Sequence, residues 1–318
     1  MEKVKEASRK ISALEIQGAT NIAKFGVDAL VEYAKELEGL SPHEILKKLS
    51  DAKNVLMESR ATEPTLRNGL NYITRSLANR MHDKQQPRLE SIAQAVKIYA
   101  AEFKKILEES KNLITQYGAR RIPTSTNINR ATIFTHCHSS VVTGILIEAH
   151  KEGKDFDVIC TETRPRYQGR LTAQELADAG IHVTQVVDSA MRWAIKNFEV
   201  DLILIGADAI TSDGTVLNKI GSRLLALVAK EEHVPFYVAS PLLKYNPETV
   251  FGGWEKIDMR DADEIWGQYE QRPKNINILN PAFETVARTY INALITEAGV
   301  FPPENVHWHF RERYPLLV

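Results

Sequence analysis

The sequence predicts an α/β protein in which an amino-terminal helical domain precedes a domain built on a mostly parallel sheet. Two observations predict this fold class. Apolar residues recur with helical spacing up to about residue 118, whereas short apolar runs alternate with helical segments after about residue 131. A chain of 318 residues, 43% of them hydrophobic, can build both cores. We therefore expect a helical domain at residues 1–118, a linker at 119–130 and the sheet domain at 131–318.

The amino-terminal domain is expected to hold about four helices. Their sequences combine helical spacing with many Lys and Glu residues and almost no β-branched runs. The second segment opens with Ser41 and Pro42, a typical helix start. The expected helices lie within residues 16–37, 41–60, 66–81 and 89–109. The polar stretch after them contains Pro123 and reads as the linker.

In the sheet domain, short apolar runs are predicted as strands. Each is followed by a loop and a helical segment, the pattern of a parallel sheet covered on both faces. The runs are residues 131–136, 157–162, 182–187, 201–208 and 235–240. Ligands of such sheets bind at the carboxyl ends of the strands. Functional residues are therefore expected directly after each run.

Composition excludes several classes of protein. With 40 basic and 41 acidic side chains, no overall field favours nucleic acid or an anionic membrane. No apolar run approaches the roughly 18–20 residues of a membrane span, and the amino terminus lacks the apolar segment of a signal peptide. Cys137 and Cys160 are too few for a disulfide framework and fit a reducing compartment. We expect a cytoplasmic protein that binds neither nucleic acid nor membrane.

The segment FTHCHSS (134–140) follows the first strand and opens a helix. Cys137 would feel the helix dipole and free backbone amides, which favour the thiolate. The alternative is an unreactive core cysteine. His136 and His138 alternate along an extended segment, so they face opposite sides, and the chain has no CxxC, HxxxH or HExxH spacing. We therefore expect no metal site.

A second polar segment, residues 161–170, follows the second strand. It carries Arg164, Arg166 and Arg170, and guanidinium groups on a loop suit phosphate recognition. A solvated surface loop is the alternative. Because this loop ends at the same sheet edge as FTHCHSS, a shared site is favoured.

The third polar segment, residues 206–222, follows the fourth strand. Asp208 comes first, a Ser-Asp-Gly turn then closes a small hairpin, and Asn218 and Lys219 are expected at the next helix start, a natural anion site. Asp208 could instead cap a turn. The chain has no GxxxxGK[ST], no GxGxxG after a strand and no GxSxG elbow. What remains is acid–base chemistry on a small phosphorylated molecule.

Together these segments resemble the family of aldose-1-phosphate isomerases and regulatory subunits of translation initiation factor two B. The resemblance rests on THCHSS, TETRPRYQGR, GADAI with DGTVLNKIG, SPLLKYNP, NPAFETV and ITEAGVFPP, and on EIQGATNIAKF and SRATEPTLRNGL in the helical part. These blocks occur in order and span nearly the whole chain. The resemblance implies a helical domain followed by a Rossmann-like catalytic domain.

For the isomerases the resemblance also implies a reaction. The archaeal members most like this chain convert ribose 1,5-bisphosphate to ribulose 1,5-bisphosphate, without metal or organic cofactor. Carried over, Cys137 would be the base that takes the C2 proton, and Asp208 the acid that protonates the ring oxygen. The C1 phosphate blocks a free aldehyde, so ring opening needs a neutral carboxyl group, while a helix start would lower the pKa of the thiol. Hydride transfer is an alternative mechanism.

The resemblance also implies which residues bind the substrate. They are Gln17, Gly18, Ala19, Arg60, Ser139, Ser140, Arg164, Asn218, Lys219 and Lys244. One departure concerns Gln17, which stands where the family has arginine and keeps hydrogen-bond donors without the charge. Another is Glu63, an added acid where relatives have small residues. Both departures affect which phosphosugar is bound more than which reaction is catalysed.

Other functions stay open at this point. A non-catalytic regulatory subunit could bind a nucleotide or sugar phosphate, but such relatives typically lack the cysteine, and Cys137 and Asp208 are both present. An isomerase of another pentose 1-phosphate, of methylthioribose or deoxyribose type, is a second alternative, and a purely structural scaffold a third. Self-association as a dimer or hexamer is expected, with residues 278–286 and 300–310 as candidate interfaces.

Overall fold

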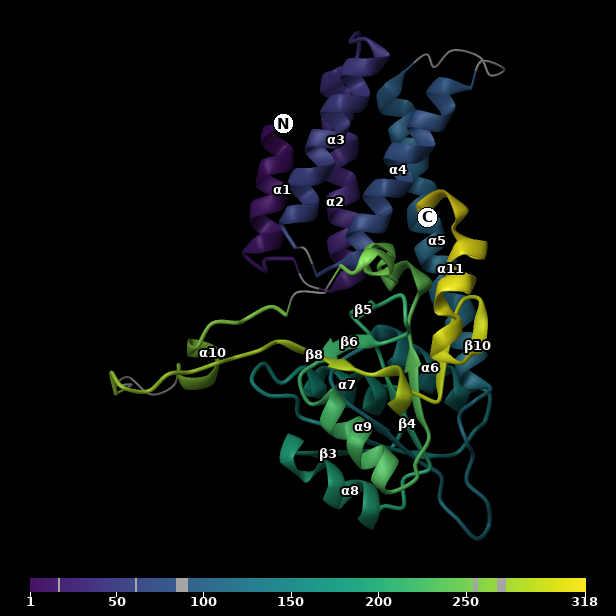
Figure 1. The fold of residues 1–318 in the computed structure, drawn as a ribbon. Coiled ribbons are helices and arrows are strands. Elements are labelled where there is room, and N and C mark those ends of the chain that lie inside the picture. Colours follow the sequence, from purple (N-terminus) through teal and green to yellow (C-terminus); the bar gives the residue numbers. More distant parts are fainter. Residues whose placement is uncertain (17, 61, 84–90, 254–256, 268–272) are drawn as a thin grey trace.

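The computed structural model describes all residues except 17, 61, 84–90, 254–256 and 268–272. The amino-terminal domain is a bundle whose helices run side by side above the sheet domain (Figure 1). Its helices are α1 (Glu2–Ser12), α2 (Ala19–Ala34), α3 (Pro42–Glu58), α4 (Pro64–His82) and α5 (Ile92–Ala119). Helices α2 to α5 match the predicted segments, and α1 is an addition that the structure reveals.

Local sequence signals explain where these helices begin. Ser41 caps α3 by accepting a hydrogen bond from the Glu44 N–H, and the Glu44 side chain accepts one from the Ser41 N–H in return. Ser91 caps α5 by accepting a hydrogen bond from the Gln94 N–H. Helix α1 buries Val4, Ala7 and Ile11 on one face. Packing of this apolar face stabilises the helix although the segment is short and charged.

The second half of the chain is built on a seven-stranded sheet in the order β10-β9-β7-β4-β1-β2-β3. Only β10 runs antiparallel to its neighbour. The strands are β1 (Thr132–Thr135), β2 (Asp157–Thr161), β3 (Val183–Val186), β4 (Leu202–Ile205), β7 (Phe236–Ala239), β9 (Ala293–Thr296) and β10 (Gly299–Phe301). Five of them are the predicted runs, so the predicted fold class is confirmed.

Helices cover both faces of this sheet. Those that connect its strands are α6 (Ser140–Lys151), α7 (Gln168–Asp178), α8 (Met191–Asn197) and α9 (Ser222–Glu231), and α11 (Val306–Arg313) lies near the carboxyl end. Neighbouring β1 residues Ile133 and Phe134 are both buried but belong to different core clusters, as expected for a strand covered on both sides. Helix α5 belongs to both halves, since Phe103 packs in the bundle core and Ile114 in the sheet core. No described helix is both long and apolar enough to cross a bilayer.

A second, antiparallel sheet lies beside the first. It consists of β5 (Ala209–Ile210), β6 (Val216–Lys219) and β8 (Phe283–Val286). The predicted hairpin is therefore present, but Asn218 and Lys219 lie on strand β6 and not at a helix start, because β6 pairs with β8 up to Lys219. Helix α9 begins only at Ser222.

The remaining elements are short. A segment that carries α10 (Asp263–Trp266) projects from the body as an arm (Figure 1). The 3-10 turns are η1 (Lys35–Leu37), η2 (Asp188–Ala190), η3 (Leu242–Lys244), η4 (Pro247–Phe251), η5 (Arg288–Tyr290), η6 (Pro303–Asn305) and η7 (Pro315–Leu317).

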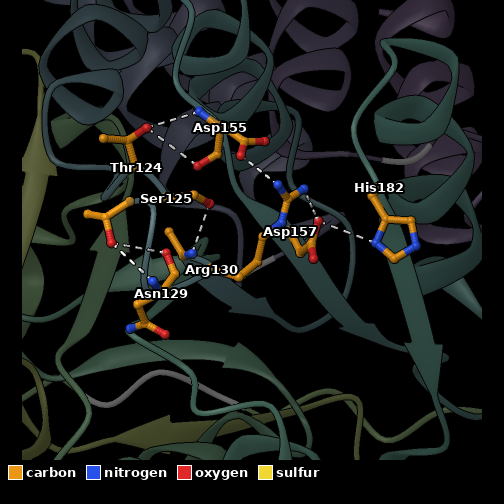
Figure 2. A network of polar contacts seen from close by, with 9 residues as sticks. Thr124, Ser125, Asn129, Arg130, Asp155, Asp157 and His182 are labelled. Atoms are coloured by element: carbon orange, nitrogen blue, oxygen red, sulfur yellow. Dashed lines mark hydrogen bonds and ion pairs between the residues drawn. The ribbon is translucent and has the colours of Figure 1, made fainter.

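The connection between α5 and β1 is fastened by a polar network (Figure 2). Thr124 Oγ1 accepts a hydrogen bond from the Asp155 N–H at 3.0 Å. The Arg130 guanidinium donates to Asp155 and Asp157, and its hydrogen bond holds the pKa of Asp157 below the usual value. His182 Nδ1 lies 3.3 Å from the same Asp157 carboxylate. This network secures the amino ends of β1 and β2. The residues predicted to be functional lie at the opposite edge of the sheet, where the carboxyl ends of the strands meet.

Candidate active site

Cys137 and Asp208 lie at the point where the strand order of the large sheet reverses. Cys137 follows β1 and Asp208 follows β4, and these strands are parallel neighbours, with Ile133 paired to Leu202. From β1 the sheet continues to β2 and β3, and from β4 it continues to β7 and β9. Open α/β sheets bind ligands in the crevice at such a switch point. The structure thus brings the two predicted catalytic residues to the same edge of the sheet, where the Asp208 charge acts on the Cys137 thiol.

The loops after β1 and β4 pack closely together. At Gly206 an added Cβ would lie 2.7 Å from Ser139 Oγ, so only glycine permits this approach. Ser139 is the N-cap of α6, and its hydroxyl accepts a hydrogen bond from the Val142 N–H, with Ser140 as the first helical residue. The approach places the Asp208 loop directly against the start of α6.

The backbone of Cys137 has a conformation that non-glycine residues rarely adopt. Its φ is +67°, in the left-handed region, where a side chain costs on the order of 1 kcal/mol. Two threonines hold it there. The Cys137 N–H donates to Thr163 Oγ1 at 3.0 Å, and the Thr172 hydroxyl donates to the Cys137 carbonyl at 2.8 Å. Strain that is supported in this way is typical of functional sites.

Burial raises the pKa of the Cys137 thiol to about 11. The Lys219 ammonium and the His138 backbone N–H act against this rise, whereas the carboxylates of Asp208 and Asp188 add to it. The predicted lowering by the helix start is therefore wrong for the free protein. Cys137 lies two residues before the N-cap Ser139, whose hydroxyl already accepts a hydrogen bond from a free amide of the helix. The loss of hydration therefore raises the pKa of the thiol by more than the helix start lowers it. At neutral pH the proton stays on sulfur.

The two histidines beside Cys137 have different partners, although the segment is not extended as predicted, because Cys137 between them has φ +67°. Buried His136 has Nδ1 at 2.6 Å from Thr161 Oγ1 and Nε2 at 2.8 Å from the Ile220 carbonyl. Burial lowers its pKa, so the ring is neutral and ties β1 to the link between β6 and α9. His138 Nδ1 lies 3.2 Å from Thr172 Oγ1. Across the part of the chain that the structure describes, no three His, Cys, Asp or Glu side chains are grouped to hold a metal ion.

Two lysines lie near Cys137 and Asp208. Lys219, at the end of β6, lies with Nζ 4.9 Å from the Phe283 ring centroid, and its charge acts on the Cys137 thiol. Lys244, at the end of η3, donates a hydrogen bond from Nζ to the Ala207 carbonyl, next to Asp208. Positive charge therefore lies near both Cys137 and Asp208.

Asn218 has a more structural setting than the lysines. It is buried, and its side-chain amide donates to Ser222 Oγ at 3.0 Å, which anchors the start of α9. Asp208 itself is held through its backbone, because its N–H donates to the Leu217 carbonyl at 2.8 Å.

The helical domain contributes Arg60 to the site. Its Nε lies 3.4 Å from Glu63 Oε1 and 3.9 Å from Asp258 Oδ2. Glu63 is 4% exposed, and burial raises its pKa to about 7. The charges of Arg60, Asp208, Lys244 and Asp258 all act on Glu63, which places this side chain beside the sheet-domain residues.

The amino-terminal turn predicted to bind substrate is described only in part. Gly18 is the N-cap of α2 with φ +84°, a value that favours glycine, and Ala19 is the first, buried residue of the helix. Gln17 lies outside the described residues.

The arginine loop has contacts of its own. The guanidinium of Arg164 donates to the Tyr167 hydroxyl and lies 5.0 Å from that ring's centroid, and Arg170 lies 4.0 Å from the same ring. Arg166 contacts Glu264 on the arm at 3.5 Å. Among the described contacts of Arg164, none is with Cys137 or Asp208. The contacts described for the three arginine side chains are thus within the loop itself and with Glu264.

Comparison with known proteins identifies the family. A model of the Initiation factor 2 subunit family matches residues 15–303, most of the chain. This chain belongs to that family. The family predicted from the motifs is thereby confirmed.

Relatives within the family carry isomerase names. Ribose 1,5-bisphosphate isomerase of Methanocaldococcus jannaschii is 39% identical over 314 residues, which cover 99% of this chain and 96% of that protein. The protein of the same name from Archaeoglobus fulgidus is 38% identical over 98% of this chain and 94% of its own length. These names agree with the isomerase that the sequence predicted.

Solved structures of the family have the same fold. A Pyrococcus horikoshii OT3 protein described as translation initiation factor eIF-2B superposes with a TM-score of 0.77 at 29% identity, covering 95% of this chain and 98% of that one. The 5-methylthioribose 1-phosphate isomerase from the same organism has a TM-score of 0.75 at 26% identity, covering 98% and 88%. The fold is therefore shared by isomerases and initiation factors. The residues of the site have to show which of the two functions this chain has.

Sequence reasoning missed several residues of this family site. Asp188 accepts hydrogen bonds from the backbone N–H groups of Thr163 at 2.8 Å and Arg164 at 2.7 Å, and so shapes the loop that holds Cys137. It follows β3 at the same sheet edge, so the rule that located Asp208 could have found it. Thr172 gives no comparable signal, because a threonine within a helix is ordinary.

Proposed function

We propose that this chain converts ribose 1,5-bisphosphate to ribulose 1,5-bisphosphate by acid–base catalysis with Cys137 and Asp208. One observation carries the proposal: a half-buried cysteine on strained backbone and a carboxyl group follow adjacent strands at the switch point. Lys219 and Lys244 supply positive charge beside them. A regulatory subunit has no need for a strained thiol beside a carboxyl group, and relatives of 38–39% identity are named for this reaction.

The proton balance assigns each residue two steps. Asp208 gives its proton to the ring oxygen as the bond from C1 to that oxygen breaks, and the Cys137 thiolate takes the C2 proton to form a double bond between C1 and C2. The thiol then returns a proton to C1, while the Asp208 carboxylate takes the proton of the C2 hydroxyl as the ketone forms. Both residues end in their starting states, and no free aldehyde appears.

The raised pKa of Cys137 is compatible with its role as the base. In the resting protein the thiol carries its proton. The thiolate forms when this proton leaves sulfur, and a thiolate of high pKa is a strong base. The Lys219 charge, which lowers the pKa of the thiol, favours this loss of the proton.

The phosphates and hydroxyls have several candidate partners. Arg60, Lys219 and Lys244 supply charge, and the start of α6 at Ser139 and Ser140 supplies backbone N–H groups. The other proposed contacts are Gln17, Gly18, Ala19 and Asn218. Arg164 takes part only if its guanidinium leaves Tyr167.

Self-association is part of the proposal, as a dimer or a hexamer. The two candidate segments, 278–286 and 300–310, each expose one large apolar side chain, Leu279 (69%) and Trp308 (59%), whereas Phe301, Val306 and Phe310 are buried in this chain's own core. Trp193 on α8 and Leu224 on α9 are further exposed apolar side chains. A cytoplasmic location, expected from the two unpaired cysteines, also belongs to the proposal.

The test is direct conversion. Purified protein is incubated with ribose 1,5-bisphosphate, and the product is identified by carbon and phosphorus NMR, once in water and once in deuterium oxide. We expect ribulose 1,5-bisphosphate, with deuterium at C1 in the second experiment because the thiol exchanges its proton. Product without any deuterium would support hydride transfer, and no product from this substrate would refute the proposed function.

An isomerase of a pentose 1-monophosphate is the second candidate. The fold similarity to 5-methylthioribose 1-phosphate isomerase and the neutral Gln17 favour testing it. The same NMR assay with that substrate decides between the two.

A further inference from the structure

Glu63 stands at the N-cap of α4 but does not cap the helix. Its backbone carbonyl accepts hydrogen bonds from the N–H groups of Leu66 and Arg67, whereas its side chain makes no capping bond. The side chain is instead buried, with Oε1 3.4 Å from Arg60 Nε. A carboxyl group at this position normally binds the free amides of its own helix. Here the carboxyl group of Glu63 contacts Arg60 and leaves these amides without it.

One oxygen of Glu63 lacks a partner. Within the described residues, buried Oε2 makes no hydrogen bond, and the same holds for Arg60 Nε, Thr65 Oγ1 and Asn68 Oδ1 around the start of α4. Buried polar atoms are nearly always paired, by protein groups, water or a ligand. The start of α4 therefore offers a cluster of buried polar atoms whose hydrogen bonds a ligand or water can complete.

The charges that face Glu63 come from every element around it. Arg60 lies in the connection before α4, Asp208 in the loop after β4, Lys244 at the end of η3, and Asp258 in the arm. The two cations balance the two carboxylates. Whether Glu63 is protonated thus decides whether this group of five side chains is neutral or carries a net negative charge.

We propose that Glu63 makes phosphate binding depend on a proton: neutral Glu63 donates its hydrogen to a phosphoryl oxygen, and ionised Glu63 repels the phosphate. The inference rests on the proposed function in taking a phosphorylated pentose as the ligand. Because Glu63 is buried and already titrates near pH 7, a phosphate dianion beside it raises its pKa further. Binding above pH 7 is therefore accompanied by uptake of a proton.

The proposal gives Glu63 a role that Arg60 alone could not fill. Arg60 already faces Glu63 and Asp258, so its charge is partly compensated before any ligand arrives. With neutral Glu63, the arginine and one O–H donor are both available to the phosphate. With ionised Glu63, affinity falls by up to about tenfold for each pH unit.

Calorimetry tests the proposal. Binding of ribose 1,5-bisphosphate, and of inorganic phosphate as a simpler probe, is measured at about pH 6 and about pH 8.5 in buffers of different ionisation enthalpy, which yields the number of protons taken up. At the higher pH we expect wild type to take up close to one proton more than Glu63→Gln. The variant, which keeps a donor but cannot ionise, should bind about tenfold more tightly there than wild type and equally well at the lower pH.

Two controls separate this role from general charge effects. Glu248→Gln removes an exposed carboxylate that contacts Arg67, and Asp258→Asn removes the second carboxylate of Arg60. Both should retain the proton uptake. Equal uptake in wild type and Glu63→Gln would overturn the proposal, as would uptake that disappears in Asp258→Asn alone.

The outcomes also distinguish this inference from the proposed function. If a phosphate compound binds with Glu63-dependent uptake but ribose 1,5-bisphosphate is not isomerised, the inference stands and the proposed function fails. If the substrate is isomerised without such uptake, only the inference fails. If wild type binds no phosphate compound at all, both fail.

Discussion

The side-chain amide of Asn68 donates a hydrogen bond to the Leu243 carbonyl at 2.8 Å and a second one to the Tyr245 carbonyl at 2.9 Å. Asn68 lies on α4, one turn beyond Glu63, and the two carbonyls flank Lys244. This single side chain therefore fastens the helical domain to the turn that places Lys244 beside Asp208. The geometry of the site depends on a contact between segments that are far apart in the sequence.

Replacement of Asn68 should damage both stability and substrate binding. Asn68→Leu leaves two buried carbonyls without their donor, so we expect the free energy of unfolding to fall by about 2–4 kcal/mol. KM should rise more than kcat falls, because Lys244 loses its anchor. Denaturant unfolding and steady-state kinetics measure these effects. Asn71→Leu on the same helix loses only one contact, to Lys53, and should cost less than about 1 kcal/mol; equal effects would contradict the assignment.

The catalytic pair is tested by removing one functional group at a time. Cys137→Ser and Asp208→Asn should each lower kcat by at least about 100-fold, the usual contribution of a general acid or base, while circular dichroism shows an intact fold. Cys160→Ala is the matched control, since Cys160 is a fully buried core residue and its loss should leave turnover near wild type. Near-normal activity in either variant of the pair would remove that residue from the mechanism.

The thiols should differ in reactivity, but both should react slowly. Burial raises the pKa of Cys137 and of Cys160 to about 11, yet Cys137 is partly exposed and Cys160 is not. With a thiol reagent at about pH 8, Cys137 should react first, on the order of 100-fold more slowly than an ordinary free thiol. Its rate should rise about tenfold per pH unit, and Lys219→Met should slow it further because the lysine lowers the pKa of the thiol. A rate that levels off near pH 7 would show a thiolate instead.

Glu63 should make the ligand-free protein less stable as the pH rises. Its pKa is about 7 in the folded protein, against a usual value of 4.5, so the folded state binds more protons between these values. The stability present below pH 4.5 is thus lost as the pH rises through 7. Relative to wild type, Glu63→Gln should therefore gain about 3 kcal/mol between about pH 4.5 and about pH 8. Urea unfolding at several pH values measures this difference, and a constant difference would place the pKa of Glu63 near its usual value.

Alternation of apolar runs and helices was enough to locate β1, β2, β3, β4 and β7, and the rule for their carboxyl ends found Cys137 and Asp208. Strand β8 was not predicted, because its partner β6 is distant in the sequence and the pairing carries no local signal. The same pairing placed Lys219 on a strand rather than at a helix start.

The electrostatics of the site were harder to predict than its location. The helix start near Cys137 is visible in the sequence, but burial of the thiol depends on packing between elements, and burial dominates. Glu63 was noticed as an added acid. Its proximity to Asp208 and Lys244 depends on the contact of Asn68 on α4 with the turn after β7. That contact cannot be read from the sequence.

The last prediction concerns the substrate and uses Gln17, which lies outside the described residues and directly precedes the N-cap of α2. A bidentate arginine contact to phosphate is worth about 1.5–3 kcal/mol, so a glutamine there should raise KM for the bisphosphate by about tenfold or more without touching the chemistry of Cys137. We expect measurable isomerisation of ribose 1,5-bisphosphate, a KM higher than that of an arginine-bearing relative, and a lower KM in Gln17→Arg.

The measurement is kcat/KM for ribose 1,5-bisphosphate and for a 5-deoxy or 5-thio pentose 1-phosphate, in wild type and in Gln17→Arg. If the bisphosphate is the substrate, wild type prefers it, and the variant gains on it alone because only the second phosphate meets the new guanidinium. If Gln17 instead matches an uncharged group at the far end of the sugar, wild type prefers the monophosphate and Gln17→Arg shifts the preference toward the bisphosphate. That second result would replace the named substrate and leave the acid–base reaction of Cys137 and Asp208 in place, since the proposed steps involve C1, C2 and the ring oxygen, whereas the two sugars differ at C5.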